Sequence, residues 1–159
     1  MGEHRVGIGT SRFVHIVAES ELDELSPPPA IGQRTDPVSS VSAHQIEAGA
    51  DIFLMPSLYE PCGLNQMYSM RYGTVPVVRA TGGLDDTVER FDPAAGTGTG
   101  FKFGPYSAQA LLDKVREALY WYTQKDAWRQ IQLNGMQVDN SWGAAARKYV
   151  RLYHALFDL

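Results

Sequence analysis

A short, uniformly apolar run at residues 52–55 constrains the fold of this chain more than any other feature. Its sequence is Ile-Phe-Leu-Met, and Pro56 ends it. A strand with one face in water usually alternates apolar and polar residues, whereas a strand that is covered on both faces does not. The run therefore predicts a buried strand of a parallel sheet.

Residues 57–72, which follow this run, predict a loop and then a helix. The loop is rich in Pro and Gly and contains one acid, Glu60. The helix is expected to begin near Leu64 and to end at Gly73, because glycine favours the left-handed conformation that terminates many helices. Open α/β sheets bind ligands at the carboxyl ends of their strands. This strand-loop-helix segment therefore predicts a ligand site.

Strand and helix signals alternate along the rest of the chain. Ser42 and Gln45 form a capping-box pattern, which predicts a helix that runs to about residue 48 and ends with Gly49. A sharp turn is expected at residues 81–84, with a short helix after it. Further strands are predicted at residues 13–17, 74–79 and 101–103, and further helices after caps at Ser107, Asp126 and Ser141. This alternation indicates an α/β fold.

The three C-terminal helices carry apolar residues at helical spacing. In the last of them the stripe consists of Ala146, Tyr149, Val150, Tyr153 and Phe157. Core packing is the expected role of these stripes, because an amphipathic helix buries its apolar face. An aromatic surface that stacks on glucan is the alternative for this region.

Two features of the loop at residue 60 could bind a ligand. Glu60 could accept hydrogen bonds from sugar hydroxyls, or it could be a solvated loop acid or a partner of the helix N-cap. The backbone amides of Cys62, Gly63, Leu64 and Asn65 lie at a helix start and lack intrahelical acceptors. With the helix dipole they form a site for an anion such as phosphate, or they are satisfied by water.

Composition narrows the class of protein. The net charge is −4, so a basic surface for nucleic acid is not indicated. No apolar run approaches the roughly 20 residues that span a bilayer. Cys62 is the only cysteine, which excludes an internal disulfide and, with no visible signal or transit peptide, favours a cytoplasmic protein. The oligomeric state is not predicted.

Other motifs do not indicate catalysis. The thiol of Cys62 is expected to be a small packed side chain, because no base lies near it in sequence to activate it. The histidines show no metal-ligand spacing, so no metal site is predicted. Residues 96–100 alternate Gly and Thr but lack the Gly-Lys-Ser/Thr of a P-loop, and they predict a surface loop.

Several segments taken together resemble bacterial glycogen synthases and plant starch synthases. The motif Glu-Pro-Cys-Gly-Leu occupies residues 60–64, and Thr-Gly-Gly occupies residues 81–83. The resemblance extends over roughly residues 42–157. The segments that carry it are residues 43–57, 59–68, 71–79, 81–88, 98–101, 134–136 and 141–142.

The resemblance implies a GT-B glycosyltransferase, in which two Rossmann-like domains enclose the active site. Such enzymes transfer glucose from ADP-glucose to an α-1,4-glucan with retention of configuration and without a metal or other cofactor. It implies that Glu60 contacts the donor glucose and stabilises charge during transfer. It also implies that the donor glucose and diphosphate are bound by Cys62, Gly63, Leu64, Asn65, Thr81, Gly82 and Gly83.

The resemblance does not extend to the whole family pattern. Residues 1–41 match it poorly and are expected to be partly disordered, while residues 42–159 correspond to an incomplete C-terminal donor-binding domain with a Rossmann-like parallel sheet and flanking helices. The N-terminal GT-B domain, the diphosphate cations and the adenine-stacking Tyr are absent from this sequence. The chain alone is therefore expected to be inactive, with ADP-glucose or ADP and α-1,4-glucan as its ligands. The alternative is a non-catalytic module that binds glucan or a synthase.

Overall fold

The computed structural model describes residues 13–16 and 40–157, and within them it forms an α/β fold. Four parallel strands make one sheet in the order of the sequence. The strands are β1 (Phe13–Ile16), β2 (Ala50–Met55), β3 (Val75–Arg79) and β4 (Phe101–Phe103). The prediction of a parallel sheet with flanking helices is confirmed. The acidic and proline-rich stretches of residues 17–39 lie outside the described residues.

Strand β2 is buried along its whole length, as the apolar run predicts. Ile52 and Leu54 belong to the larger apolar cluster, and Phe53 and Met55 to a smaller one. Because successive side chains of a strand point to opposite faces, the two clusters lie on opposite sides of the sheet. The larger cluster also contains Val75, Val77, Phe91, Phe101, Ala118, Trp128 and Ile131.

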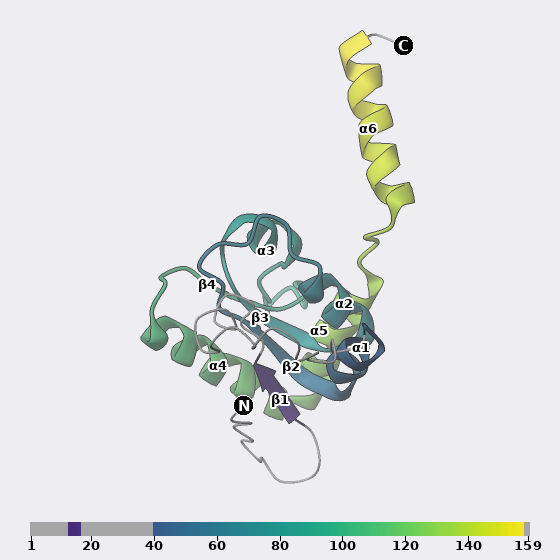
Figure 1. Cartoon of the computed structure of the whole chain (residues 1–159). Coiled ribbons are helices and arrows are strands. Elements are labelled where there is room, and N and C mark those ends of the chain that lie inside the picture. The colour runs from purple at the N-terminus through teal and green to yellow at the C-terminus, as the bar shows by residue number, and fades with distance from the viewer. Residues whose placement is uncertain (1–12, 17–39, 158–159) are drawn as a thin grey trace, which may run out of the picture.

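The described residues form six helices, and Figure 1 labels them. Their bounds are α1 (Ser40–Gly49), α2 (Asn65–Tyr72), α3 (Gly82–Thr87), α4 (Ala108–Thr123), α5 (Lys125–Gln137) and α6 (Trp142–Phe157). Helices α4 and α5 supply Ala118, Trp128 and Ile131 to the larger cluster. In the described part of the chain, no helix is long and apolar enough to cross a membrane.

The predicted end of α2 is confirmed, but the predicted cap of α1 is wrong. Gly73 terminates α2 in the left-handed conformation, with φ of 81°. Helix α1 begins at Ser40, so Ser42 lies inside the helix rather than at its cap. Gly49 is the last residue of α1 and not a left-handed cap. A distant hydroxyl replaces a local cap, because Thr74 Oγ1 lies 2.5 Å from the carbonyl oxygen of Glu47.

The caps of the C-terminal helices are partly as predicted. The Ser107 hydroxyl accepts a hydrogen bond from the Ala110 amide, and the Ser141 hydroxyl accepts one from the Ala144 amide, each at 3.2 Å. The cap predicted at Asp126 is wrong, because α5 begins earlier and Asp126 lies in its first turn. In that position the negative charge of Asp126 interacts favourably with the positive end of the helix dipole.

Helix α6 is the largest departure from the sequence prediction. It projects away from the sheet and its helices (Figure 1), and none of its residues is buried. Trp142 is 91% exposed, and Tyr149 and Tyr153 are more than half exposed. Core packing was the expected role of the stripe on α6, and the structure contradicts it because no described residue covers the helix.

Candidate functional site

The carboxyl ends of β2 and β3 bring the two predicted ligand segments to one edge of the sheet. Strand β2 ends at Met55 and leads into the loop that contains Glu60. Strand β3 ends at Arg79 and leads into α3. Since parallel strands end at the same edge, segments far apart in the sequence can meet there.

The two segments are in direct backbone contact. The Gly83 amide donates a hydrogen bond to the Glu60 carbonyl oxygen at 2.9 Å. A Cβ atom at Gly82 would lie 2.1 Å from the Glu60 carbonyl oxygen, and a Cβ atom at Gly83 would lie 1.9 Å from that of Cys62. Only glycine fits these two positions, so the glycine pair allows the loop to approach this closely.

The glycine pair belongs to a helix and not to the predicted turn. Helix α3 begins at Gly82, and Thr81 is its extended N-cap residue, with φ of −152° and ψ of 134°. The Leu84 amide donates to the Thr81 carbonyl oxygen at 3.1 Å, which closes the first helical turn. The prediction of a sharp turn followed by a helix from Asp85 is therefore wrong by three residues.

Glu60 presents a partly exposed carboxylate beside this contact. Among the residues that the structure describes, none forms a hydrogen bond or an ion pair with that carboxylate. It is not the cap of the following helix, because Leu64 occupies the N-cap position of α2 and no side chain caps it. The carboxylate of Glu60 can therefore accept hydrogen bonds from hydroxyl groups of a ligand.

The start of α2 supplies donors next to Glu60. The amides of Cys62, Gly63 and Leu64 donate to no backbone carbonyl of the described residues. Asn65 is the first residue of α2 and makes contacts of its own. Free amides at the positive end of a helix can bind an anionic group. One loop of five residues thus carries both a partly exposed carboxylate and backbone amides without a backbone acceptor.

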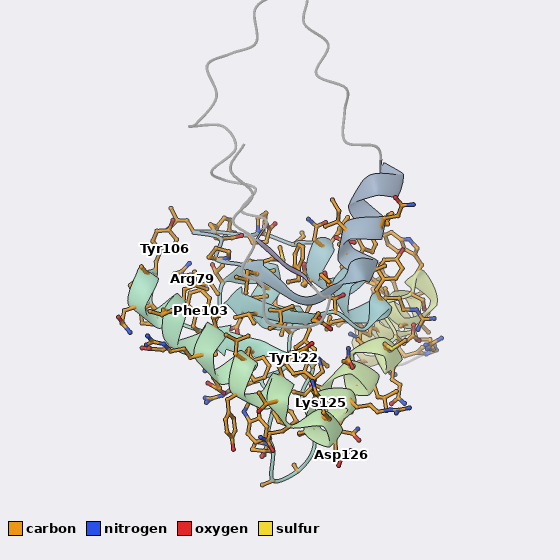
Figure 2. The ribbon with its side chains drawn as sticks, turned by 90° about the horizontal axis from the view of Figure 1, so that it is seen from below. Arg79, Phe103, Tyr106, Tyr122, Lys125 and Asp126 are labelled. Carbon is orange, nitrogen blue, oxygen red and sulfur yellow. The ribbon has the colours of Figure 1, made fainter. Side chains whose placement is uncertain are left out.

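Arg79 is a residue of this edge that sequence reasoning missed. Its Nη1 donates to the Leu58 carbonyl oxygen at 2.5 Å, and its Nε donates to that of Gly104 at 3.1 Å. Its guanidinium also lies 5.5 Å from the ring centre of Tyr106, and Figure 2 shows Arg79 and Tyr106 together near the end of β4. Arg79 ties the loop after β2 to the loop after β4. Its place at the end of a strand was the only sequence signal.

Cys62 and His44 do not form a nucleophile and base. Cys62 is exposed, so the expectation of a packed thiol is wrong. The His44 Nδ1 atom lies 3.4 Å from the Glu47 Oε2 atom, and the His44 ring packs edge-on against Tyr68. Burial raises the pKa of Glu47, and the hydrogen bond and charge of His44 oppose that rise. The His44 side chain thus contacts Glu47 of its own helix and Tyr68 of α2.

The described part of the chain contains no cluster of metal-ligand side chains, and its glycine-rich segment at residues 96–100 is held by a side chain of α5. No group of three or more His, Cys, Asp or Glu side chains there could hold a metal ion. The glycine-rich segment at residues 96–100 is fixed by Asn134, whose Nδ2 donates to the carbonyl oxygens of Gly96 and Gly98 at 3.0 and 2.9 Å. Its second half is buried and is not the surface loop that the sequence predicts.

An open cleft lies between α2 and the start of α6. Its volume is about 770 Å³, and Leu64 and Met67 are among the residues that line it. Tyr68 and Arg71 line it from α2, and Asn140 and Trp142 line it from the segment that leads into α6. Aromatic rings beside amide and hydroxyl groups are chemistry that suits a saccharide.

The chain is similar to glycosyltransferases in sequence. Residues 35–131 match the family described as glycosyl transferases group 1. A glycogen synthase from Koribacter versatilis (strain Ellin345) is 63% identical over 111 residues, which are 70% of this chain and 23% of that protein. A glycogen synthase from Thermotoga maritima is 59% identical over 112 residues, which are 70% of this chain and 23% of that protein.

The chain is also similar to the solved structures of two synthases. The catalytic domain of starch synthase IV from Arabidopsis thaliana, bound to ADP and acarbose, is 36% identical with a TM-score of 0.62, over 71% of this chain and 24% of that chain. A sucrose-phosphate synthase from Thermosynechococcus elongatus is 31% identical with a TM-score of 0.51, over 70% of this chain and 27% of that one.

The matches cover most of this chain but only a part of each relative. The chain spans about a quarter of the length of the glycogen synthases that it matches. The family match covers more than half of the chain and includes the loop of Glu60 and the glycine pair at the start of α3. The chain therefore belongs to the group 1 glycosyl transferases, and the proteins that it is similar to include glycogen synthases and a starch synthase.

Proposed function

We propose that this chain is the donor-binding part of a glycogen or starch synthase. In this role it binds the glucose and diphosphate of ADP-glucose while glucose is transferred, with retention, to an α-1,4-glucan. Glu60 accepts hydrogen bonds from the donor glucose and stabilises positive charge that develops in the transition state. The reaction requires no metal or other cofactor.

One observation carries this proposal. The hydrogen bond from the Gly83 amide to the Glu60 carbonyl oxygen joins the two segments that contain all the proposed donor-site residues. In this proposal the Glu60 carboxylate binds the glucose, and the amides of Cys62, Gly63 and Leu64 in the same loop receive the diphosphate. The relative whose structure is described with ADP, starch synthase IV, supports a nucleotide-sugar donor.

The chain by itself is proposed to be inactive. Among the described residues, the proposed site has a carboxylate and amides, and we assign to it neither a cation for the diphosphate nor an acceptor side. Each missing charged hydrogen bond weakens donor binding by roughly 1.5–3 kcal/mol, or about one to two orders of magnitude. We expect no glucosyl transfer from ADP-glucose to glycogen by the purified chain, and turnover that depends on Glu60 would contradict this.

A chimera tests the donor role directly. The matching segment of the Thermotoga maritima glycogen synthase, which is 59% identical to this chain over 112 residues, is replaced by the segment from this chain. We expect the chimera to extend glycogen from ADP-glucose, and Glu60→Gln to lower its turnover by at least about a hundredfold. Asp126→Asn, an exposed acid on α5, is the matched control. Full turnover in the Glu60→Gln chimera would refute the role of Glu60.

A second candidate function is a non-catalytic module that binds glucan or a synthase. The specific observation in its favour is the exposed aromatic surface of α6, with Trp142 and Tyr153 91% and 55% exposed. Retention on glycogen distinguishes the two functions. Retention that survives Glu60→Ala but is lost with Trp142→Ala or Tyr153→Ala supports the module, whereas no retention of the native chain on glycogen is the result that the donor-binding role alone predicts.

A further inference from the structure

A buried amide side chain lies directly beneath the loop of Glu60. Gln66 is the second residue of α2, and its side chain is fully buried. Its Nε2 atom lies 3.2 Å from the Cys62 carbonyl oxygen, 3.1 Å from the Gly63 carbonyl oxygen and 2.9 Å from Thr87 Oγ1. The two hydrogens of one amide nitrogen thus hold two carbonyls of the loop and one hydroxyl of α3.

The hydroxyl of Thr87 continues this connection to the glycine pair. Thr87 Oγ1 accepts from Gln66 and donates to the Gly83 carbonyl oxygen at 2.5 Å. The Gly83 amide donates in turn to the Glu60 carbonyl oxygen. The hydrogen bonds therefore run from Glu60 through Gly83, Thr87 and Gln66 to Cys62. The backbone between Glu60 and Cys62 closes the ring.

The ring requires the side-chain chemistry of Gln66 specifically. All three of its neighbours within reach of Nε2 are oxygen acceptors, so a glutamate there would set a carboxylate against two carbonyl oxygens. The Gln66 Oε1 atom is buried and has no hydrogen-bond partner among the described residues. Burial of an unpaired carbonyl oxygen is unfavourable, and a leucine would avoid it. What a leucine cannot supply is the pair of donor hydrogens.

We propose that Gln66 and Thr87 are positioning residues that hold the Glu60 loop against the glycine pair of α3. Gln66 is fully buried and Thr87 is half-buried, and both act through the backbone of the loop and of Gly83. We call the hydrogen bonds of Gln66 and Thr87 that join the loop to α3 the bridge. The effect of this bridge on glucose transfer rests on the proposed function. The positioning itself does not, because it is a property of the free chain.

Hydrogen exchange of the Gly83 amide in the full chain tests the bridge. This amide is protected while the Glu60 carbonyl stays in place. Thr87→Val removes the hydroxyl at nearly constant volume, and Thr87→Ser keeps it. We expect exchange at Gly83 to become about tenfold faster with valine, the factor for one lost buried hydrogen bond, and to return close to the native rate with serine.

Two internal references separate loop release from unfolding. The Leu84 amide donates to Thr81 within α3, and the Ile131 amide lies in the buried part of α5. We expect both to keep their native rates in Thr87→Val and in Gln66→Leu. Equal acceleration of all three amides, an unchanged rate at Gly83, or no rescue by serine would overturn the proposal.

Titration of the same variants with ADP-glucose distinguishes the bridge from the proposed function. Faster exchange at Gly83 together with weaker ADP-glucose binding in Thr87→Val supports both. Faster exchange at Gly83 in a chain whose native form does not bind ADP-glucose supports the bridge and contradicts the proposed function. Native donor affinity in Thr87→Val, despite a released loop, contradicts the role of the bridge in donor binding.

Discussion

Helices α5 and α6 have similarly clear apolar stripes but opposite environments. Trp128 and Ile131 of α5 are 4% and 0% exposed and pack in the larger apolar cluster. In α6 no residue is buried, and Trp142 is 91% exposed. An amphipathic pattern therefore predicts which face of a helix is buried, but the presence of a covering surface is a tertiary property. For α6 no such surface exists in the described part of this chain.

Truncation of one aromatic or aliphatic residue in each helix gives the largest expected difference. Ile131→Ala should lower the free energy of unfolding by about 2–5 kcal/mol, because it opens a cavity in the core. Trp142→Ala should change it by no more than about 0.5 kcal/mol, because its side chain loses almost no contacts within the chain. Urea unfolding measures both. A comparable loss in the two variants would show that α6 is packed in solution.

The comparison extends to the glycines of the sheet edge. Gly83→Ala should lower the free energy of unfolding by about 2–4 kcal/mol, because its Cβ would overlap the Cys62 carbonyl oxygen and force the loop away. Gly104→Ala is the matched control, since no atom lies within 4 Å of a Cβ there. The control should unfold like the native chain. Equal stability of the two variants would show that the contact between loop and glycine pair is absent.

The smallest expected effect concerns the polar segment that precedes α6. The hydrogen bonds of Ser141 and then the charge of Arg147 lower the pKa of Asp139 below its ordinary value of 3.8. A lowered carboxyl pKa contributes stability that is present above the ordinary value and is lost as the pH falls through the lowered pKa. We expect the first turn of α6 to loosen only in acid, as the pH falls below 3.8 and through the lowered pKa of Asp139. At neutral pH, Asp139→Asn should reproduce that loosening.

Amide exchange in the first turn of α6 measures this loosening. The amides of Ala144 and Ala145 donate to Ser141 and report on the turn. The Ile131 amide of α5 is the reference and should keep its native rate. A shift of the whole unfolding transition with Asp139→Asn would contradict the view that α6 is attached only by this polar segment.

Several features that depend on neighbours in the sequence were predicted correctly, although the local caps predicted at Ser42 and Asp126 were wrong. The buried strand β2, the end of α2 at Gly73 and the cap at Ser107 follow from local composition and are confirmed. The family resemblance implied that the loop of Glu60 and the glycine pair are parts of one site, and the structure brings the two segments into contact. Their roles as donor-site residues stay a prediction.

Features that depend on distant residues were missed. The end of α1 is satisfied by Thr74, which lies 27 residues from Glu47. Helix α3 begins three residues early because its first two glycines fit against the Glu60 loop. The hydrogen bond between Gln66 and Thr87 spans 21 residues, so no local pattern contains it. In each case the partner is set by the fold of the sheet edge and not by spacing in the chain.

Titration of the isotopically labelled chain with ADP-glucose, followed by amide chemical shifts, tests the central claim most directly. We expect shifts at the amides of residues 60–65 and 81–83, and none in α6, because the donor site is confined to the contact between the Glu60 loop and the glycine pair. Glu60→Gln should weaken these shifts at every concentration of ADP-glucose. Shifts confined to α6 and its cleft, or shifts in residues 60–65 that Glu60→Gln leaves unchanged, would contradict the account.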